Sequence, residues 1–165
     1  MTYQDKVNYL EAILESMWDF RFLYRDLQHL LLENEELRQA YSVFSTRSIS
    51  DGRQILRTMV ESGMMNATEE QVDALILNIW VLVVSWSSFL QTTSIQQNGE
   101  SQGGRDLLKR AIFQIICLEE PYLCESIQSM LPALKKNYLG SLPSDPMTLF
   151  PSVTNPIAAP ASRQQ

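Results

Sequence analysis

Two arginines on an otherwise apolar helix face are the residues of this sequence best suited to bind a ligand. Arg21 and Arg25 lie four residues apart, and at 100° per residue they project to the same side as Trp18. A guanidinium keeps its charge when partly buried, so either one could receive a ligand's carboxylate or other anion in a mostly apolar cavity. The structural alternative is that both pair with carboxylates such as Asp26 or Asp51 while their stems pack on aromatic rings.

No pattern typical of an enzyme or a metal centre accompanies these arginines. The sequence has no GxGxxG, Walker, GxSxG or HExxH motif, and its only histidine, His29, is predicted to be a surface or capping residue. The two cysteines, Cys117 and Cys124, cannot build a disulfide framework or a zinc motif. We therefore expect no catalytic residue, no metal ligand and no cofactor.

A second clue lies in the middle of a long predicted helix. Its apolar stripe runs from Tyr41 through Phe44 to Met59, but Ser48 and Gly52 interrupt it. A glycine inside a helix costs about 1 kcal/mol relative to alanine, which suggests a local reason for its presence. The two alternatives are close packing of another helix against Gly52 and a cavity wall.

The segment from residue 69 to 92 is apolar on nearly every side, except for a polar line through Asn78 and Ser85. These polar residues and the lack of a basic flank argue against a membrane span. We expect a helix that is buried on most of its surface, partly in an oligomer interface. Trp80 and Trp86 are either anchors of that interface or core residues.

The elements that must position these residues are helices. Periodicity over the first 140 residues and the lack of β-hairpin signals predict an all-α fold. Asn34 should cap the long helix and Gly63 should end it, whereas Thr68 and Gln71 form a capping box for the next one. The predicted helices cover residues 3–24, 26–32, 35–62, 69–92, 105–118 and 121–139.

Proline marks the C-terminal part of the chain. Pro121 should start the last helix, and Pro132 should kink or divide it. Five of the seven prolines fall in the last 25 residues. We therefore expect one helical domain over residues 1–140 and a proline-rich, irregular tail over 141–165.

The charge balance excludes several classes of partner. The chain of 165 residues has a formal net charge of -6, so it lacks the positive surface that nucleic acid or an anionic membrane would attract. The N-terminus contains no apolar stretch of the kind found in secretory signals. With two cysteines and no such signal, the chain is expected to be cytoplasmic.

Four short motifs, taken in order, resemble the C-terminal regulatory domain of the TetR-family bacterial transcriptional repressors over about residues 5–139. Each motif alone is loose, and their order and spacing carry the resemblance. They are W-D-F-R-F-L-Y-R-D-L from Trp18, N-E-E-L from Asn34, M-V-E-S-G-M from Met59 and W-x-x-F-L from Trp86.

The resemblance implies an all-α regulatory domain of about five to six helices. Such a domain binds a small effector among its central helices and forms a homodimer through a four-helix bundle, with two helices from each subunit. In that family a helix-turn-helix domain precedes this domain. No segment before Tyr9 has the basic and polar residues of a recognition helix, so we expect no direct DNA binding by this chain.

The sequence thus predicts an effector-sensing and dimerising regulatory domain, whose ligand is small and largely hydrophobic, with or without an acidic group. The alternative is a helical protein–protein interaction dimer with no small ligand, and a pocket of roughly 300 Å³ or more would distinguish the two. The expected ligand-binding residues are Trp18, Arg21, Phe22, Arg25, Phe44, Ser48, Gly52, Met59, Asn78, Ser85 and Trp86. The expected dimer-interface residues are Trp80, Val83, Val84, Leu108, Ile112, Ile115 and Ile116.

Overall fold

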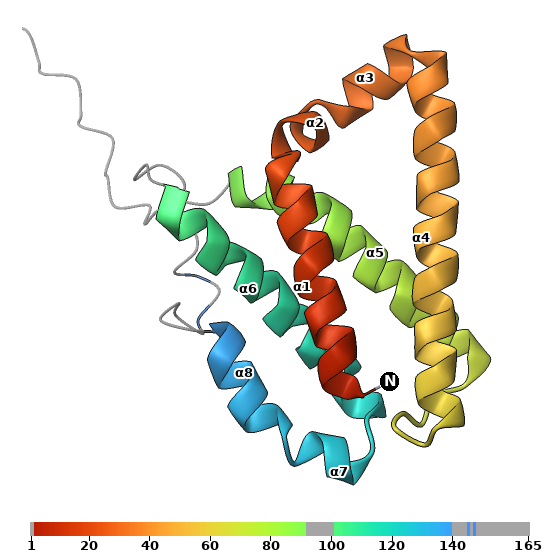
Figure 1. Cartoon of the computed structure of the whole chain (residues 1–165), viewed down its shortest axis with the longest axis vertical. Coiled ribbons are helices and arrows are strands. Elements are labelled where there is room, and N and C mark those ends of the chain that lie inside the picture. Colours follow the sequence, from red (N-terminus) through yellow and green to blue (C-terminus); the bar gives the residue numbers. More distant parts are fainter. Residues whose placement is uncertain (1, 92–100, 140–144, 146, 148–165) are drawn as a thin grey trace, which may run out of the picture.

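The computed structural model describes residues 2–91, 101–139, 145 and 147, and these residues contain helices and no β-strand (Figure 1). The all-α fold class is confirmed. The helices are more numerous than the pattern predicts, because the first and the last predicted helices are broken. In chain order the elements are α1 (Tyr3–Asp19), α2 (Arg21–Arg25), α3 (Leu27–Glu33), α4 (Glu35–Glu61), α5 (Glu69–Gln91), α6 (Ser101–Glu119), η2 (Glu120–Tyr122), α7 (Glu125–Gln128) and α8 (Leu131–Leu139).

Side-chain caps set the starts of the longest helices as predicted. The Asn34 side chain accepts a hydrogen bond from the Leu37 backbone N–H at the start of α4. Thr68 and Gln71 form the capping box before α5, with each side chain bonded to the other residue's backbone N–H. After α4, Gly63 has a φ of 74°, a left-handed conformation that glycine adopts without strain.

The first predicted helix is divided at Phe20. The chain leaves helical geometry there, with φ -101° and ψ 18°, and continues as the short helix α2. α1 has no basic residue in its last turn, and the side chain of Phe20 is 55% exposed. The break turns the chain toward α3 and α4, so residues after Phe20 do not continue the face of α1.

The last predicted helix is divided as well. Residues 120–122 around Pro121 form the 3-10 turn η2, a short helix α7 follows, and α8 begins at Leu131 with Pro132 in its first turn. Proline is tolerated in a first turn because its missing N–H would be unpaired there. The predicted loop before α6 lies outside the described residues up to 100, but residues 101–104 are helical. Apart from residues 145 and 147, the predicted tail from 141 to 165 also lies outside them.

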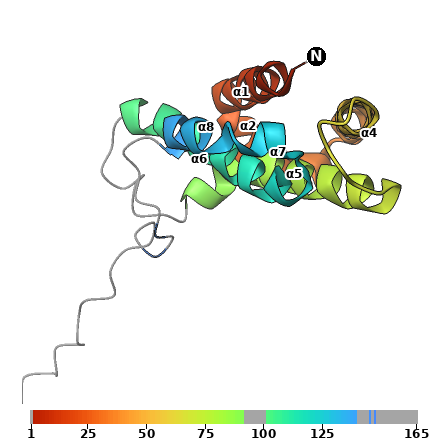
Figure 2. The same cartoon turned by 90° about the horizontal axis from the view of Figure 1, so that it is seen from below.

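The core lies where α1, α5, α6 and α8 meet. Figure 2 shows α1 lying across a layer formed by α5, α6 and α8, with α4 to one side. α6 packs against all three of the other helices, so its inward residues are enclosed on several sides. The side chains that are at most 1% exposed include Val7, Leu14, Leu56, Met59, Val72, Leu90, Ile112, Ile115, Ile116 and Leu131.

α4 is 27 residues long and is held at its C-terminal end. Only Leu56 and Met59 of α4 are buried, whereas Val43 in its N-terminal half is 70% exposed. The segment after α4 bonds to the segment after α6: the backbone N–H of Asn66 donates to Tyr122 O at 2.7 Å, and that of Cys124 donates to Met64 O at 3.0 Å. These bonds fasten the α4–α5 connection to the end of α6.

Among the described residues, one helix is long and apolar enough to cross a membrane by length and composition, and it is α5 over Glu69–Leu90. A core helix of a soluble protein passes the same test. α5 contributes Val72, Leu75, Ile76 and Ile79 to the core, while Leu77 and Val81 on its other side are 55% and 54% exposed. One face of α5 is therefore covered within the chain and the other is not.

Candidate ligand cavity

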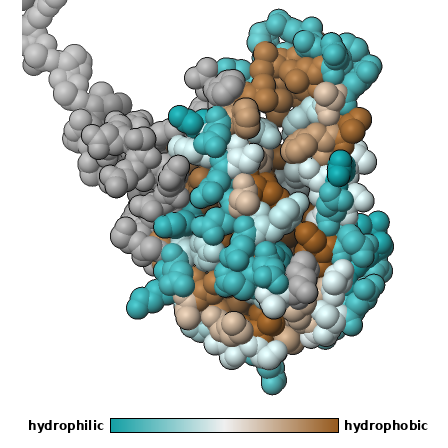
Figure 3. Space-filling model, in the orientation of Figure 1, coloured by the Kyte–Doolittle hydropathy of each residue, from teal (hydrophilic) through white to brown (hydrophobic). Residues whose placement is uncertain are grey.

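A cavity of about 820 Å³ lies between α1, α4 and α5, with α2 and α3 at one end. Its size falls in the upper part of the range found for small-molecule sites. Figure 3 shows hydrophobic side chains recessed between the more polar surfaces of α1 and α4. The cavity exists because α1 packs on α6 and α4 packs on α5, with α4 to one side of α1 (Figure 2).

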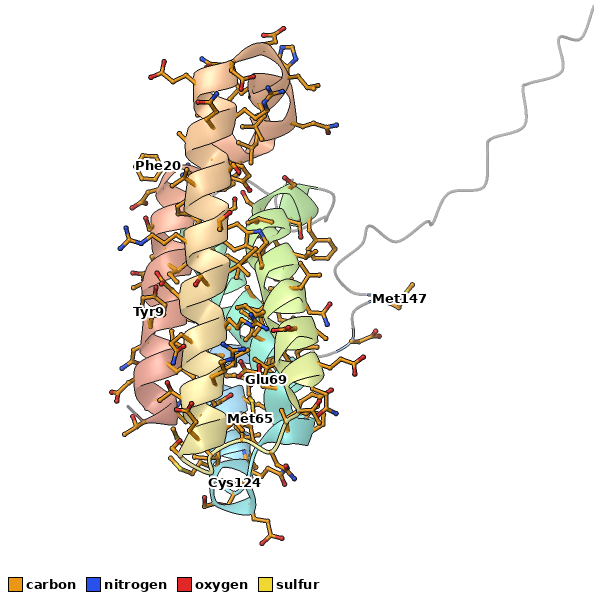
Figure 4. All side chains as sticks on the ribbon, turned by 90° about the vertical axis from the view of Figure 1, so that its right-hand side faces the viewer. Tyr9, Phe20, Met65, Glu69, Cys124 and Met147 are labelled. Carbon is orange, nitrogen blue, oxygen red and sulfur yellow. The ribbon has the colours of Figure 1, made fainter. Side chains whose placement is uncertain are left out.

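Aromatic rings form much of its wall. The ring centroids of Tyr41 and Phe44 on α4 are 6.2 Å apart, and those of Phe44 and Trp80 on α5 are 5.9 Å apart. Tyr24 on α2 is half-buried, and burial, followed by the nearby Tyr41, raises the pKa of its hydroxyl. Tyr9 on α1 adds a ring at the open side, where its side chain is 48% exposed (Figure 4).

Gly52 serves both of the roles that the sequence left open. It lines the cavity, and a Cβ added to it would lie 2.4 Å from Cδ1 of Ile76 on α5. At Gly52, α5 comes close to a part of α4 that has no side chain. Ser48, one turn earlier, lies on the cavity wall and contributes a hydroxyl to an otherwise apolar stripe.

The described charged residues that line the cavity are few, and each has an oppositely charged neighbour. Arg47 and Asp51 lie on α4 with Arg47 Nε 3.8 Å from Asp51 Oδ2, and their side chains are 83% and 58% exposed. Lys6 of α1 is only 4% exposed and donates to both carboxylate oxygens of Glu119 at the end of α6. These residues place no unpaired charge on the cavity wall.

The Lys6–Glu119 pair is part of a buried network that includes Tyr3. The Tyr3 hydroxyl donates to Glu119 Oε2 at 3.0 Å, and Glu119 is fully buried. Burial and the neighbouring Glu119 carboxylate raise the pKa of Tyr3 well above its ordinary range. Because a buried carboxylate needs a charged partner, Glu119 holds Lys6 in place and ties α1 to α6.

Three of the predicted ligand-binding residues line the cavity: Phe44, Ser48 and Gly52. Met59 is fully buried in the core and does not line it. Trp18 and Trp86 lie on the other side of α1, around a hollow of about 10 Å³ that could hold no more than a water molecule. Among the described residues, these two tryptophans line that small hollow and not the cavity.

The structure places Arg21 outside the cavity, contrary to the prediction. Its side chain is exposed, donates to the backbone oxygen of Trp18 at 3.0 Å and lies over the Trp18 ring at 4.9 Å. The break at Phe20 explains the error, because helical projection does not continue across it. The side chains of Phe22 and Arg25 lie outside what the structure describes.

Asn78 and Ser85 are exposed on α5 and do not face the cavity, which corrects their assignment as ligand-binding residues. The Ser85 hydroxyl donates to Val81 O of its own helix at 2.5 Å. The cavity instead meets the opposite side of α5, where Ile76, Ile79 and Val83 line it. Because the other sides of α5 are apolar, the polar residues Asn78 and Ser85 mark the side that faces solvent.

The predicted dimer-interface residues also need correction. Trp80 and Val83 line the cavity, and Val84 is half-buried beside Trp86 at the small hollow. The four predicted residues of α6 lie in the core of the single chain and offer no surface to a second copy. They are Leu108, Ile112, Ile115 and Ile116, which are between 0% and 8% exposed.

Tyr9, Tyr24 and Trp80 are cavity residues that the sequence did not indicate as such. Tyr9 and Tyr24 fall outside the apolar face of the first helix, so periodicity alone could not place them there. Their type was the available signal, because exposed or half-exposed aromatic residues at helical spacing are common in ligand pockets.

The family comparison agrees with this architecture. The family model for TetR, a bacterial transcriptional repressor, matches residues 1–131. The chain belongs to the TetR family. A TetR-family transcriptional regulator from Marinobacter aquaeolei VT8 has a crystal structure at 2.49 Å resolution that is similar to this chain, with a TM-score of 0.73 and 30% sequence identity.

The alignment with this TetR-family regulator covers 84% of the present chain and 64% of the other chain. This chain therefore spans less than two thirds of that regulator's length. No curated protein matches the chain. TetR is a family of transcriptional regulators and not an enzyme family.

Proposed function

We propose that this chain is the effector-sensing and dimerising regulatory domain of a cytoplasmic TetR-family repressor, and that it binds a small, largely hydrophobic molecule in the cavity between α1, α4 and α5. The observation that carries the proposal is the cavity itself, with a volume of about 820 Å³ and aromatic walls from Tyr41, Phe44 and Trp80. A protein–protein interaction dimer has no need for such a space, whereas ligand sites typically have one.

Uptake of the neutral apolar dye Nile red tests this proposal. Ser48→Trp fills the cavity from the wall of α4, and Ser50→Trp adds the same side chain at an exposed position of the same helix. We expect Ser48→Trp to weaken dye binding by about ten-fold or more, since the space for the dye is lost, and Ser50→Trp to change it less than about two-fold. Equal dye binding by both variants would place the dye elsewhere and contradict the proposal.

The dimer that we propose uses the exposed face of α5. Leu77 and Val81, one turn apart, are more than half exposed and extend the polar line of Asn78 and Ser85. A face that mixes large apolar and small polar residues suits a two-fold contact, in which each copy covers the other's α5. This face replaces the buried residues that the sequence suggested.

Light scattering on the purified chain tests the dimer. Leu77→Asp together with Val81→Asp should convert a dimer into a monomer at micromolar concentration, because four unpaired carboxylates would be buried in each interface. Leu32→Asp places the same charge at a 77% exposed position on α3 and should leave the dimer intact. A monomer mass for the unmodified chain would overturn this part of the proposal.

DNA binding is not expected from these 165 residues, since the net charge of -6 opposes contact with phosphates. A sequence-dependent gel shift at physiological salt would contradict this expectation.

A further inference from the structure

The charges around the cavity bear on which molecules it can accept. Lys6 is the one cation among the described lining residues that is buried, and it is fully engaged by Glu119. A ligand carboxylate could take Lys6 only by leaving the buried Glu119 carboxylate without a cationic partner, which is strongly unfavourable. Lys6 is therefore a structural residue of the cavity wall and not a site for an anion.

The second pair, Arg47 and Asp51, gives the same result for a different reason. Its members lie on one helix at the edge of the cavity, their charges cancel, and the Arg47 side chain is 83% exposed to water. An anion near Arg47 would also lie near the Asp51 carboxylate and would lose its own hydration on entering the apolar space. A cationic ligand near Asp51 would be repelled by Arg47 and would also lose its hydration on entering the apolar space.

Neutral hydrogen-bonding groups are present on the wall. The hydroxyls of Tyr24, Tyr41 and Ser48 have no hydrogen-bond partner within the part of the chain that the structure describes. Hydroxyls can both donate and accept, so they suit the alcohol, carbonyl or ether groups of an uncharged molecule. The surrounding rings of Phe44 and Trp80 suit its apolar body.

On these grounds we propose that the cavity selects an uncharged, largely apolar ligand with a hydroxyl or carbonyl group, and discriminates against acidic ligands of the same shape. This inference rests on the proposed function, since it concerns the same cavity. It replaces the acidic group that the arginines suggested in the sequence, because Arg21 lies outside the cavity and the described cations on its wall are paired.

Three probes with one alkyl chain test the inference: 1-decanol, decanoate and decylammonium. Calorimetric titration of the purified chain at low salt should give 1-decanol an affinity about ten-fold or more above that of decanoate. Decylammonium should also bind more weakly than 1-decanol. Competition with Nile red shows that the probes occupy the same cavity.

A charge variant sharpens this test. Asp51→Asn leaves Arg47 without its carboxylate, so the ratio of decanoate affinity to 1-decanol affinity should rise about three-fold at low salt and fall back as salt is added. Glu35→Gln is the matched control, since it frees Arg38 on the same helix away from the cavity and should leave the ratio unchanged.

The outcomes separate the two proposals. If none of the three probes competes with Nile red, the ligand cavity itself is wrong and this inference fails with it. If decanoate binds as tightly as 1-decanol, only the inference about charge is overturned. Arg25→Gln then identifies the cation, because loss of decanoate binding in that variant would assign the anion site to Arg25.

Discussion

The two sides of α1 differ in how they are packed. One side, which includes Leu14, is buried in the core, where residues of α5 and α6 share a water-sized hollow with it. The other side, which includes Ile13, faces the cavity and the separate helix α4. Neighbouring residues of α1 thus have different roles. The densely packed side stabilises the fold, and the open side leaves room for a ligand.

The largest effect should come from the buried ion pair that joins the cavity wall to the core. Lys6→Met leaves the Glu119 carboxylate buried and unpaired, so the free energy of unfolding should fall by about 3–5 kcal/mol in urea denaturation. Glu119→Leu in the Lys6→Met background should restore most of the loss, because both charges are then absent. The exposed Lys136→Met on α8 serves as control, and an equal loss there would contradict this reading.

Adjacent residues of α1 allow a direct comparison of its two sides. Leu14→Ala, at a position that is 1% exposed, should lower the free energy of unfolding by about 2–5 kcal/mol. Ile13→Ala should lower it by only about 1 kcal/mol, because Ile13 already borders open space. Equal losses in thermal or urea unfolding would mean that both sides are equally dense.

The contact at Gly52 tests how closely α4 and α5 approach. Alanine is favoured over glycine in a helix by about 1 kcal/mol, but the added Cβ meets Cδ1 of Ile76. We expect Gly52→Ala to be nearly neutral in the unmodified chain. In the Ile76→Val background, which lacks that methyl group, it should stabilise the chain by about 1 kcal/mol, and a double-mutant cycle without coupling would contradict this.

The smallest effect concerns the start of α1, which both sides share. Hydrogen bonds from Thr2, chiefly from its backbone N–H, lower the pKa of Asp5. The folded pKa lies below the unfolded value, so the ionised carboxylate stabilises the chain above about pH 4 and this contribution is lost as the pH falls through the folded pKa. Unfolding measured across this acid range should show a shallower pH dependence in Asp5→Asn, and an unchanged profile would exclude the contribution.

The sequence predicted the helix ends better than the site. Asn34, Thr68 and Gly63 have local roles that depend on the next few residues only, so their types were enough to place the ends of α4 and the start of α5. The break at Phe20 could not be predicted in the same way. It has no proline or glycine, and the packing of α2 against α5 joins residues far apart in the sequence, which no local pattern contains.

The candidate site was only partly predictable for a similar reason. The interruption of an apolar stripe at Ser48 and Gly52 correctly indicated a special place on α4, because that signal lies within one helix. Periodicity also shows that α5 has an apolar side, but it cannot tell whether a cavity or a second subunit covers it. Trp80 was therefore expected at an interface, and the structure places it on the cavity wall.

The backbone bonds that join residues 64–66 to residues 122–124 fix the C-terminal end of α4, so that a change in the angle of the helix would pivot about this end. A helix of 27 residues is about 40 Å long, so a tilt of one degree about the fastened end moves its far end by about 0.7 Å. Tyr41 and Phe44 lie in the N-terminal half of α4, far from the fixed end, and Gly52 lies nearer that end. The width of the cavity beside Tyr41 and Phe44 is thus far more sensitive to the angle of α4 than the close contact at Gly52 is.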